Sequence, residues 1–369
     1  MRESWRVWVL LISLVGLAGG AVPAREPSQR RIEFEGTPVR IAGGTSTHGK
    51  ALGIVVARPS GAFAIAFSKG GALAVRTFAA SGDVEEVAQL GSLGYSNSFN
   101  IKSLAALGSH NYGVTWEYDA SYHIGVTRSY VSFVGPGLRR TVPDSDPDRL
   151  FNPVGDTDGE GGFFTVVWDL ASGGIVFRHW SATGELLRSG PVNVAGYPLQ
   201  AMAFRGGLAV LVWRPGDPSS IAWINRNGGL VEEAEAAGSG LVTNRSDLVV
   251  DLSALPNLVA ARFGPRPRQL RPAKVLAQPT SPWGSEGASL AIDADGTSLL
   301  AWTDADGFQL RAFNRLGLPL SPAVTGPFGH RPRLSEIGPG RFLLVWHDAT
   351  AVPAGVRATI WAQRVSVVD

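Results

Sequence analysis

The sequence predicts an all-β protein, a single β-propeller built of four-stranded blades. Glycine and proline are abundant, at 46 and 24 of 369 residues, and the short apolar runs between them are typical of many short strands joined by tight turns. One unit recurs along the chain with a period of about 40–50 residues, which is the length of a propeller blade. Within each unit, apolar and polar residues alternate with period two and show no helical stripe, so a helical repeat is excluded.

The recurring unit has a constant order of features. It begins at a glycine, continues through a strand to an aromatic residue, turns, and continues through a second strand to a turn glycine. The clearest copy comprises residues 162–168, residues 175–180 and Gly184. The other copies end their first strand at an aromatic residue, namely Phe67, Trp116, Trp213, Phe263, Trp302 and Trp346. Turn glycines follow three of these at nearly equal distance, at Gly82, Gly228 and Gly317, whereas the copy at Phe263 has no matching glycine.

The four strands of a blade are labelled A to D from the centre outward. The run from glycine to aromatic residue is B, the next run is C, and the run after the turn glycine begins D. The run before B is A, and we expect A strands at residues 52–57, 199–204 and 247–252. Seven copies predict seven blades. Six blades are the alternative, because residues 241–275 depart most from the repeat.

The two ends of the chain are predicted to share the last blade. The chain ends on a C strand at about residues 364–368, so this blade lacks its D strand. Residues 32–41 can supply it, because residues 31–35 alternate between polar and apolar side chains ahead of the first full repeat. Closing the ring would protect the sheet edges. A pair of face-packed sheets, as in a β-sandwich, is the alternative fold.

The Phe-x-Val-x-Trp, Arg-x-Phe and glycine pattern resembles the repeats of bacterial secreted β-propeller proteins. The resemblance extends from about residue 51 to the end of the chain. It implies the fold and little else, because propellers host many functions. The sequence lacks the Gly-His and Trp-Asp pairs of WD40 repeats, apart from Trp168-Asp169, and the kelch double glycine in regular register.

Residues 1–24 are predicted to be a signal peptide. Arg2 and Arg6 precede an apolar stretch at residues 7–17, and Val22 and Ala24 provide small residues at the cleavage site. The stretch is too short to span a bilayer core of ~30 Å, although a membrane anchor is the alternative. We therefore expect residues 25–369 to form a secreted or periplasmic propeller domain, monomeric and without stable membrane insertion.

Composition narrows the set of partners. The chain has no cysteine, so the exported protein must be stabilised without disulfides. Its formal net charge of +2 argues against nucleic acid as a partner. The six histidines are scattered and form no ligand pair. We predict neither a metal nor a cofactor and assign no catalytic residue.

Three Asp-x-Asp-Gly segments, at residues 156–159, 293–296 and 304–307, contain the residue types that bind Ca²⁺. Aspartate and glycine also favour tight turns for local reasons, and we prefer this interpretation. The segments at 293–296 and 304–307 flank one strand, so they should lie at opposite ends of a blade and cannot share an ion.

Binding residues are expected on one face of the propeller. In a four-stranded blade the B–C hairpins and the D–A connections emerge on the same face, and variable loops on a rigid scaffold commonly carry function. The candidate residues on this face are Glu117, Tyr118, Asp146, Asp148, Arg214, Arg266, Arg268, Arg331, His347 and Asp348. The repeated tryptophans and phenylalanines could stack on carbohydrate, but their constant register predicts packing between blades.

Three hypotheses about function follow. The first is a secreted, non-catalytic module that binds an extracellular protein or glycan through this loop face. The second is a propeller-type hydrolase or lyase acting on extracellular polysaccharide. The third is a structural surface module without a ligand. Convergent carboxylates and a histidine would favour the enzyme, whereas arginine, proline and aromatic residues would favour binding.

Overall fold

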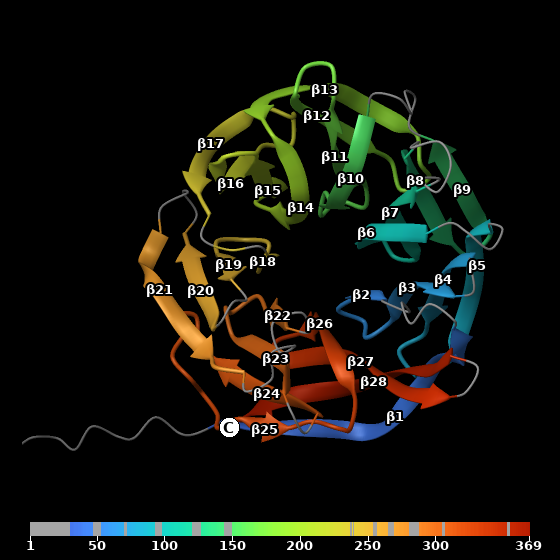
Figure 1. Cartoon of the computed structure of the whole chain (residues 1–369), viewed down its shortest axis with the longest axis vertical. Helices are drawn as coiled ribbons and strands as arrows, with labels where there is room; N and C mark the ends of the chain where they lie inside the picture. The colour runs from blue at the N-terminus through green and yellow to red at the C-terminus, as the bar shows by residue number, and fades with distance from the viewer. Residues whose placement is uncertain are drawn as a thin grey trace, which may run out of the picture.

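The computed structural model describes residues 30–369, apart from residues 47–52, 70–71, 93–97, 120–126, 144–149, 237, 239, 254–256, 265–268, 280–287, 305–306 and 353–354. The predicted signal peptide lies outside the described residues. The described chain forms seven four-stranded antiparallel sheets arranged around a central axis (Figure 1). It is therefore a seven-bladed β-propeller, as predicted, and not a β-sandwich. No helix in the described chain is long and apolar enough to span a membrane.

The blades follow one another along the chain. Blades 1 and 2 are β2 (Ile54–Ala57), β3 (Phe63–Lys69), β4 (Ala72–Phe78), β5 (Val84–Ser92) and β6 (Ser98–Leu107), β7 (Asn111–Asp119), β8 (Thr127–Gly135), β9 (Leu138–Pro143). Blades 3 and 4 are β10 (Leu150–Thr157), β11 (Phe163–Asp169), β12 (Gly174–Trp180), β13 (Leu186–Ala195) and β14 (Tyr197–Phe204), β15 (Gly207–Arg214), β16 (Asp217–Ile224), β17 (Leu230–Glu235).

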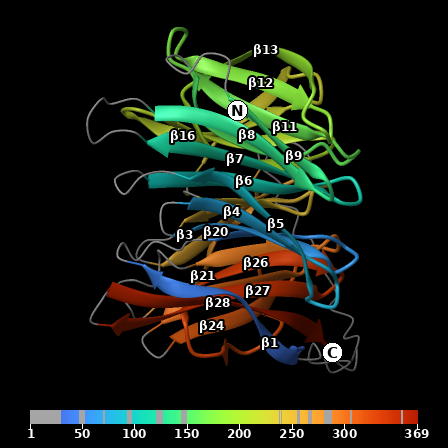
Figure 2. The same ribbon diagram turned by 90° about the vertical axis from the view of Figure 1, so that its right-hand side faces the viewer.

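Blades 5 and 6 are β18 (Gly240–Thr243), β19 (Val249–Ser253), β20 (Leu258–Phe263), β21 (Gln269–Ala277) and β22 (Ser289–Ile292), β23 (Ser298–Asp304), β24 (Gly307–Phe313), β25 (Val324–Thr325). Blade 7 is β26 (His330–Gly338), β27 (Arg341–Val352), β28 (Gly355–Val368) and β1 (Arg31–Ser46). Seen from the side, the strands run across the view and the turns gather at their two ends (Figure 2).

The N-terminal strand closes the ring. β1 pairs antiparallel with β28, from Arg31 opposite Val368 to Ser46 opposite Val356. Blade 7 therefore takes its outer strand from the beginning of the chain and its other three strands from the end, and blue and red strands lie side by side in Figure 1. The predicted closure is confirmed.

The strand assignment in blade 5 was wrong by one strand. The sequence placed an A strand at residues 247–252 and a B strand ending at Phe263. The structure shows β19 as strand B and β20 as strand C, with β18 as strand A. The prediction failed because β19 ends in no aromatic residue, whereas Phe263 packs edge-on against Trp223 of strand C in blade 4, at 6.0 Å between ring centroids.

The repeated turn glycine is required by the packing of neighbouring blades. Gly184 and Gly228 lie in C–D turns with φ of +85° and +84°, a region that favours glycine. A Cβ atom on Gly184 would lie 2.6 Å from the Phe133 ring of blade 2, and one on Gly228 would lie 2.7 Å from the Phe177 ring of blade 3. Each turn therefore approaches strand C of the preceding blade closely, between clusters of buried apolar side chains.

Side chains of the inner strands also bond the blades to one another. The Ser103 hydroxyl of blade 2 accepts the N–H of Gly155 in blade 3 at 3.0 Å. Blade 3 is joined to blade 4 in the same way, because Asp156 accepts the N–H of Ala203 at 2.8 Å. The Gln200 side chain continues the series by bonding both backbone groups of Leu241 in blade 5 at 2.8 Å. These contacts satisfy polar groups that the ring buries around its axis.

Candidate functional site

The predicted binding residues divide into two groups on the upper face, which is the end of the blades with the B–C hairpins and D–A connections. Glu117 and Tyr118 on β7 and Arg214 on β15 belong to blades 2 and 4. Arg331 on β26, with His347 and Asp348 on β27, belongs to blade 7. Blade 1 separates the groups on one side and blades 5 and 6 on the other. Asp146, Asp148, Arg266 and Arg268 lie outside the described residues.

A polar network joins blades 2, 3 and 4. Glu117 is only 6% exposed, and its Oε2 lies 3.0 Å from Lys102 Nζ. The other oxygen, Oε1, accepts the backbone N–H of Asn152 at 2.6 Å. The Asn152 side chain in turn donates to the carbonyl of Pro198 in blade 4. Both oxygens of the buried carboxylate are therefore engaged.

Bulges in the A strands position this network. Lys102 lies where the pairing of β6 with β7 shifts, and Asn152 lies at the corresponding shift between β10 and β11. Asn152 has φ of +54°, a conformation that asparagine tolerates better than most residues. A bulge turns side chains away from the regular alternation, so these two are directed to contacts that a regular strand would not allow.

An aromatic platform, defined as Trp168, Tyr197 and Trp213, lies beside this network on blades 3 and 4. The rings of Trp168 and Tyr197 are 5.2 Å apart between centroids, across the seam between the two blades. Tyr197 lies directly opposite Trp213 in the pairing of β14 with β15. Trp213 is 45% exposed. Leu199 on the adjacent strand β14 is 40% exposed, and Leu170, two residues after Trp168, is 52% exposed.

The prediction that the repeated aromatic residues pack between blades holds for most B strands and is wrong for Trp213. The B-strand residues Phe67, Trp116, Trp302 and Trp346 are between 2% and 6% exposed. In blade 4 the pairing of β15 with β16 shifts between Val212 and Arg214. Trp213 occupies this bulge, directly after Val212, whose side chain packs on the seam with blade 3.

The backbone around the platform is held rigidly. Gly196 is the single residue between β13 and β14, with φ of +115°, and its N–H donates to the Gly173 carbonyl at 3.0 Å. A Cβ atom there would lie 2.8 Å from the carbonyl of Trp213, so only glycine fits. Arg214 donates from Nε to the Ala195 carbonyl at 2.9 Å and pairs with Glu233. Arg214 therefore supports the platform from its edge.

Tyr197 keeps its proton at neutral pH. Burial raises the pKa of its phenol, and the nearby negative charge of Glu117 raises it further. The phenol can thus donate a hydrogen bond to a ligand, while the ring offers an apolar face. The platform accordingly combines the apolar ring surface of three aromatic residues with one phenolic donor.

The blade 7 group is basic. His347 is 8% exposed, and burial together with the positive charges of Arg331 and Arg333 lowers its pKa to about 4. Burial and the charge of Arg331 also lower the pKa of Arg333. Asp348 is half-buried on the same strand. This group shares no strand or neighbouring blade with the aromatic platform.

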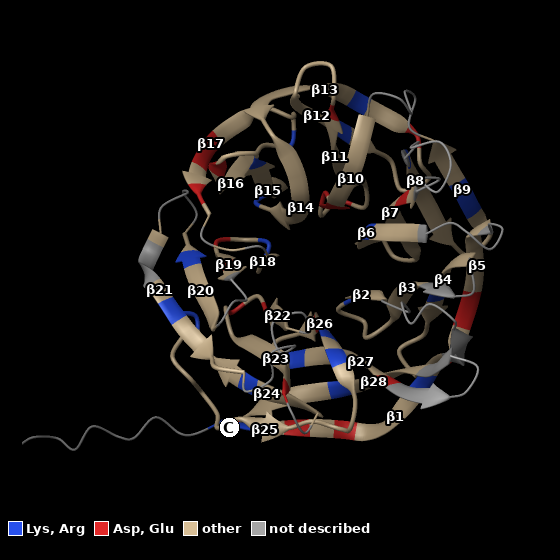
Figure 3. Cartoon of the chain, in the orientation of Figure 1, with Lys and Arg blue, Asp and Glu red and all other residues tan. Residues whose placement is uncertain are grey.

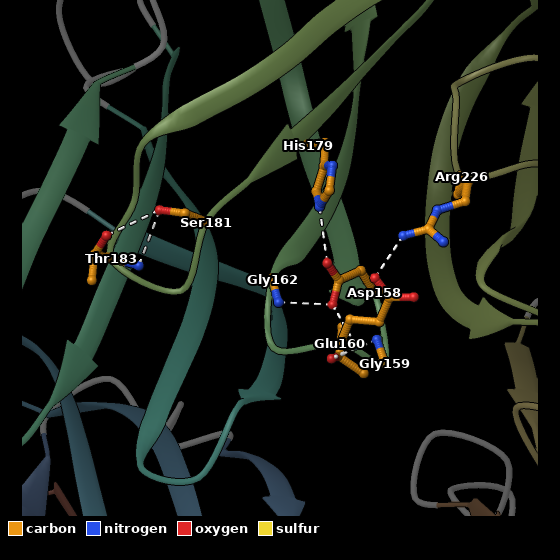
Figure 4. Close-up of polar contacts among 9 residues, drawn as sticks. Asp158, Gly159, Glu160, Gly162, His179, Ser181, Thr183 and Arg226 are labelled. Atoms are coloured by element: carbon orange, nitrogen blue, oxygen red, sulfur yellow. Dashed lines mark hydrogen bonds and ion pairs between the residues drawn. The ribbon is translucent and has the colours of Figure 1, made fainter.

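A second polar cluster lies on the lower face, at the A–B turn of blade 3 (Figure 4). Asp158 Oδ1 accepts the N–H groups of Glu160 and Gly162, both at 2.7 Å, and Oδ2 contacts His179 Nε2 at 2.9 Å. Arg226 of blade 4 pairs with Glu160 at 2.6 Å. The Asp158 carboxylate thus organises the turn, as expected for an Asp-x-Asp-Gly segment. Within the described ranges, no three His, Asp or Glu side chains are placed to hold a metal ion.

Sequence reasoning missed Lys102, Asn152 and Tyr197. Asn152 precedes Pro153, and this dipeptide is a recognisable signal for an irregular backbone within a strand. Lys102 and Tyr197 carry no such signal, because their role depends on which blades become neighbours.

No family model and no curated protein matches the sequence. Among solved structures, the WD40 repeats of RRP9 are 12% identical and align over 90% of this chain and 100% of theirs, with a TM-score of 0.56. The Swd1 β-propeller domain of Myceliophteria thermophila is 12% identical over 88% of this chain and 99% of its own, with a TM-score of 0.53.

A structure from a study of two prolyl endopeptidases is 16% identical over 92% of this chain, with a TM-score of 0.50, and this chain spans about half (50%) of its length. At such identities the likeness shows the β-propeller fold alone. The resemblance to bacterial secreted repeat proteins stays a prediction.

Proposed function

We propose that the protein is a secreted, non-catalytic binding module that recognises a protein partner through the aromatic platform on its upper face. The observation that carries the proposal is the 45% exposure of Trp213, at a repeat position where four other blades bury an aromatic residue. Tryptophan, tyrosine and arginine are the residues most enriched among binding hot spots, and all three occur at this site.

The surroundings of the platform fit a protein interface. Leu170 and Leu199, each two residues after a platform residue, are exposed apolar side chains. Charged groups lie close by: Lys102 pairs with Glu117, whose charge acts on Tyr197, and Arg214 follows Trp213. An apolar centre with a polar rim is the usual arrangement of such interfaces. The fixed backbone at Gly196 lowers the entropy lost on binding. A glycan stacked on the rings is the other ligand class, and the test below separates the two.

The polysaccharide hydrolase or lyase is less favoured by this geometry. Glycoside hydrolysis requires two carboxyl groups held in different protonation states on either side of the bond that breaks. Glu117, the buried carboxylate beside the platform, has one oxygen on Lys102 and the other on the N–H of Asn152. It is therefore arranged to hold blades together rather than to transfer a proton.

Export forms part of the proposal, on the strength of the charged, apolar and small-residue order of residues 1–24. Export is tested by expressing the full chain in a host that has signal peptidase. Cell fractionation and N-terminal sequencing of the product follow. We expect the exported protein to begin at Arg25. Retention of residues 1–24 in a membrane fraction would contradict cleavage and favour an anchor.

The binding proposal is tested by comparing Trp213→Ala with Phe328→Ala. Phe328 is 71% exposed on the D–A connection before blade 7, so it is a matched exposed aromatic away from the platform. Proteins that cross-link to the mature chain in an extracellular extract are identified and purified. Each is then titrated against the wild type, Trp213→Ala and Phe328→Ala, and the same three chains are applied to a glycan array. We expect Trp213→Ala to weaken binding about 30-fold, as for a hot-spot residue, and Phe328→Ala to change it little.

The outcomes separate the hypotheses. A protein whose affinity depends on Trp213 but not on Phe328 supports the proposal. Glycan binding that depends on Trp213 would replace the protein partner with a glycan. Equal binding by both variants and the wild type would remove the platform as the site.

A further inference from the structure

Blade 7 presents two arginines near the upper end of its innermost strand. Arg331 lies where the pairing of β26 with β27 shifts, and its φ is +52°. Its backbone N–H donates to Thr303 Oγ1 of blade 6 at 3.2 Å, so the irregular backbone is held by the neighbouring blade. Arg333 follows after the buried Pro332, and the basic residues of this blade are blue in Figure 3.

Arg333 and His347 face the same side of the blade. Side chains alternate along a strand, so Arg333 shares a side with Ser335, whose hydroxyl accepts an N–H from blade 1 at 2.9 Å. His347 shares a side with Val345, which packs in the apolar cluster between blades 7 and 1. The guanidinium and the imidazole therefore converge on the seam with blade 1.

Neither arginine is neutralised by a carboxylate in the described part of the chain. The side-chain contact of Arg333 is with the Pro332 carbonyl, at 3.1 Å. Other arginines pair with acids, as Arg214 does with Glu233 and Arg341 with Glu35. Placing two like charges together with partial burial is unfavourable unless an anion compensates them.

We propose that Arg331 and Arg333 form a subsite for an oxyanion, the carboxylate, sulfate or phosphate group of a ligand, with His347 as a neighbouring donor. Guanidinium groups present parallel N–H donors that match the oxygens of such groups. A neutral imidazole offers one further N–H. The subsite lies on blade 7, away from the aromatic platform, and does not depend on the function proposed for that platform.

Titration of the mature chain with sodium sulfate, phosphate and acetate against chloride at equal ionic strength tests the proposal. We expect saturable binding by calorimetry and a concentration-dependent rise in Tm with at least one oxyanion. Arg331→Gln and Arg333→Met should each weaken that binding about tenfold or more. Arg341→Gln is the control, because Arg341 lies on the same blade at the opposite end and pairs with Glu35.

A second measurement distinguishes a ligand-binding arginine from a structural one. Without added oxyanion, Arg333→Met should melt at the same temperature as the wild type or higher, since it removes an uncompensated buried charge. A structural arginine would lower Tm when replaced. If Arg333→Met does not fold, the half-buried Arg331 still provides the test through Arg331→Gln.

The remaining arms identify the source of the oxyanion. Binding of acetate and of a uronate oligosaccharide indicates a carboxylate ligand. Binding of sulfate and of a sulfated oligosaccharide indicates a sulfate ester, and binding of phosphate indicates a phosphate group. Equal oxyanion affinity in the wild type, Arg331→Gln and Arg341→Gln overturns the proposal, as does the lack of saturable binding. Trp213→Ala should leave oxyanion binding unchanged. A negative result for the oxyanion subsite is therefore distinguishable from a negative result for ligand binding at the aromatic platform.

Discussion

The substitution Gly228→Ala tests why a glycine recurs in the C–D turn of the blades. Its φ of +84° costs an L-residue about 1–2 kcal/mol. The added methyl would also lie 2.7 Å from Cδ1 and 3.1 Å from Cγ of Phe177 in blade 3, a close approach to an aromatic ring within a packed seam. Overpacking of this kind costs about 1–3 kcal/mol, so the free energy of unfolding should fall by about 2–5 kcal/mol in total.

Gly216→Ala provides the matched control. Gly216 lies in the same blade on the opposite face, has φ of +85°, and a Cβ atom there would meet nothing within 4 Å. It should lose only the conformational part, about 1–2 kcal/mol. Urea unfolding of both variants, followed by tryptophan fluorescence, measures the difference. Equal losses would refute the claim that close contact between blades requires the glycine.

Three further predictions concern the lower turn, the buried histidine and the ring closure. Asp158→Ala should lower the free energy of unfolding by about 3 kcal/mol, because two N–H groups and His179 lose their acceptor, while Glu160→Gln in the exposed pair with Arg226 should leave it unchanged. The pKa of His347, about 4, lies below its ordinary 6.5, so the native state binds fewer protons than the unfolded state in this range. The free energy of unfolding should therefore decrease as the pH is lowered from 6.5 to 4, by up to about 3 kcal/mol. In His347→Gln, the free energy of unfolding measured with urea should depend less on pH across this window. Deletion of β1 should leave the edge of β28 unpaired. We expect a lower Tm by circular dichroism and association of the chains by size-exclusion chromatography. A deletion variant that stays monomeric with an unchanged Tm would contradict the closure.

The sequence by itself determined the class of fold and the closure of the ring, and it favoured seven blades over six. Period-two alternation identifies strands because it reflects the pleat of a single strand, which needs no knowledge of neighbours. The closing role of residues 32–41, which lie within the observed β1, was also readable, since the last blade had only three strands and an unpaired edge must be covered.

Only the tertiary structure decided which aromatic residues are buried and which residues meet. Trp213 and Trp302 occupy the same repeat position, yet one is 45% exposed and the other 6%. Leu300 and Trp302 pack on the seam with blade 5, whereas Val210 and Val212 pack on the seam with blade 3, so the alternation in blade 4 is offset by one residue. A shift of one residue reverses the side to which a side chain points, and local composition does not record it. The contact of Glu117 with Asn152, and the convergence of Arg333 with His347 on one seam, likewise depend on register and on the order of blades in space.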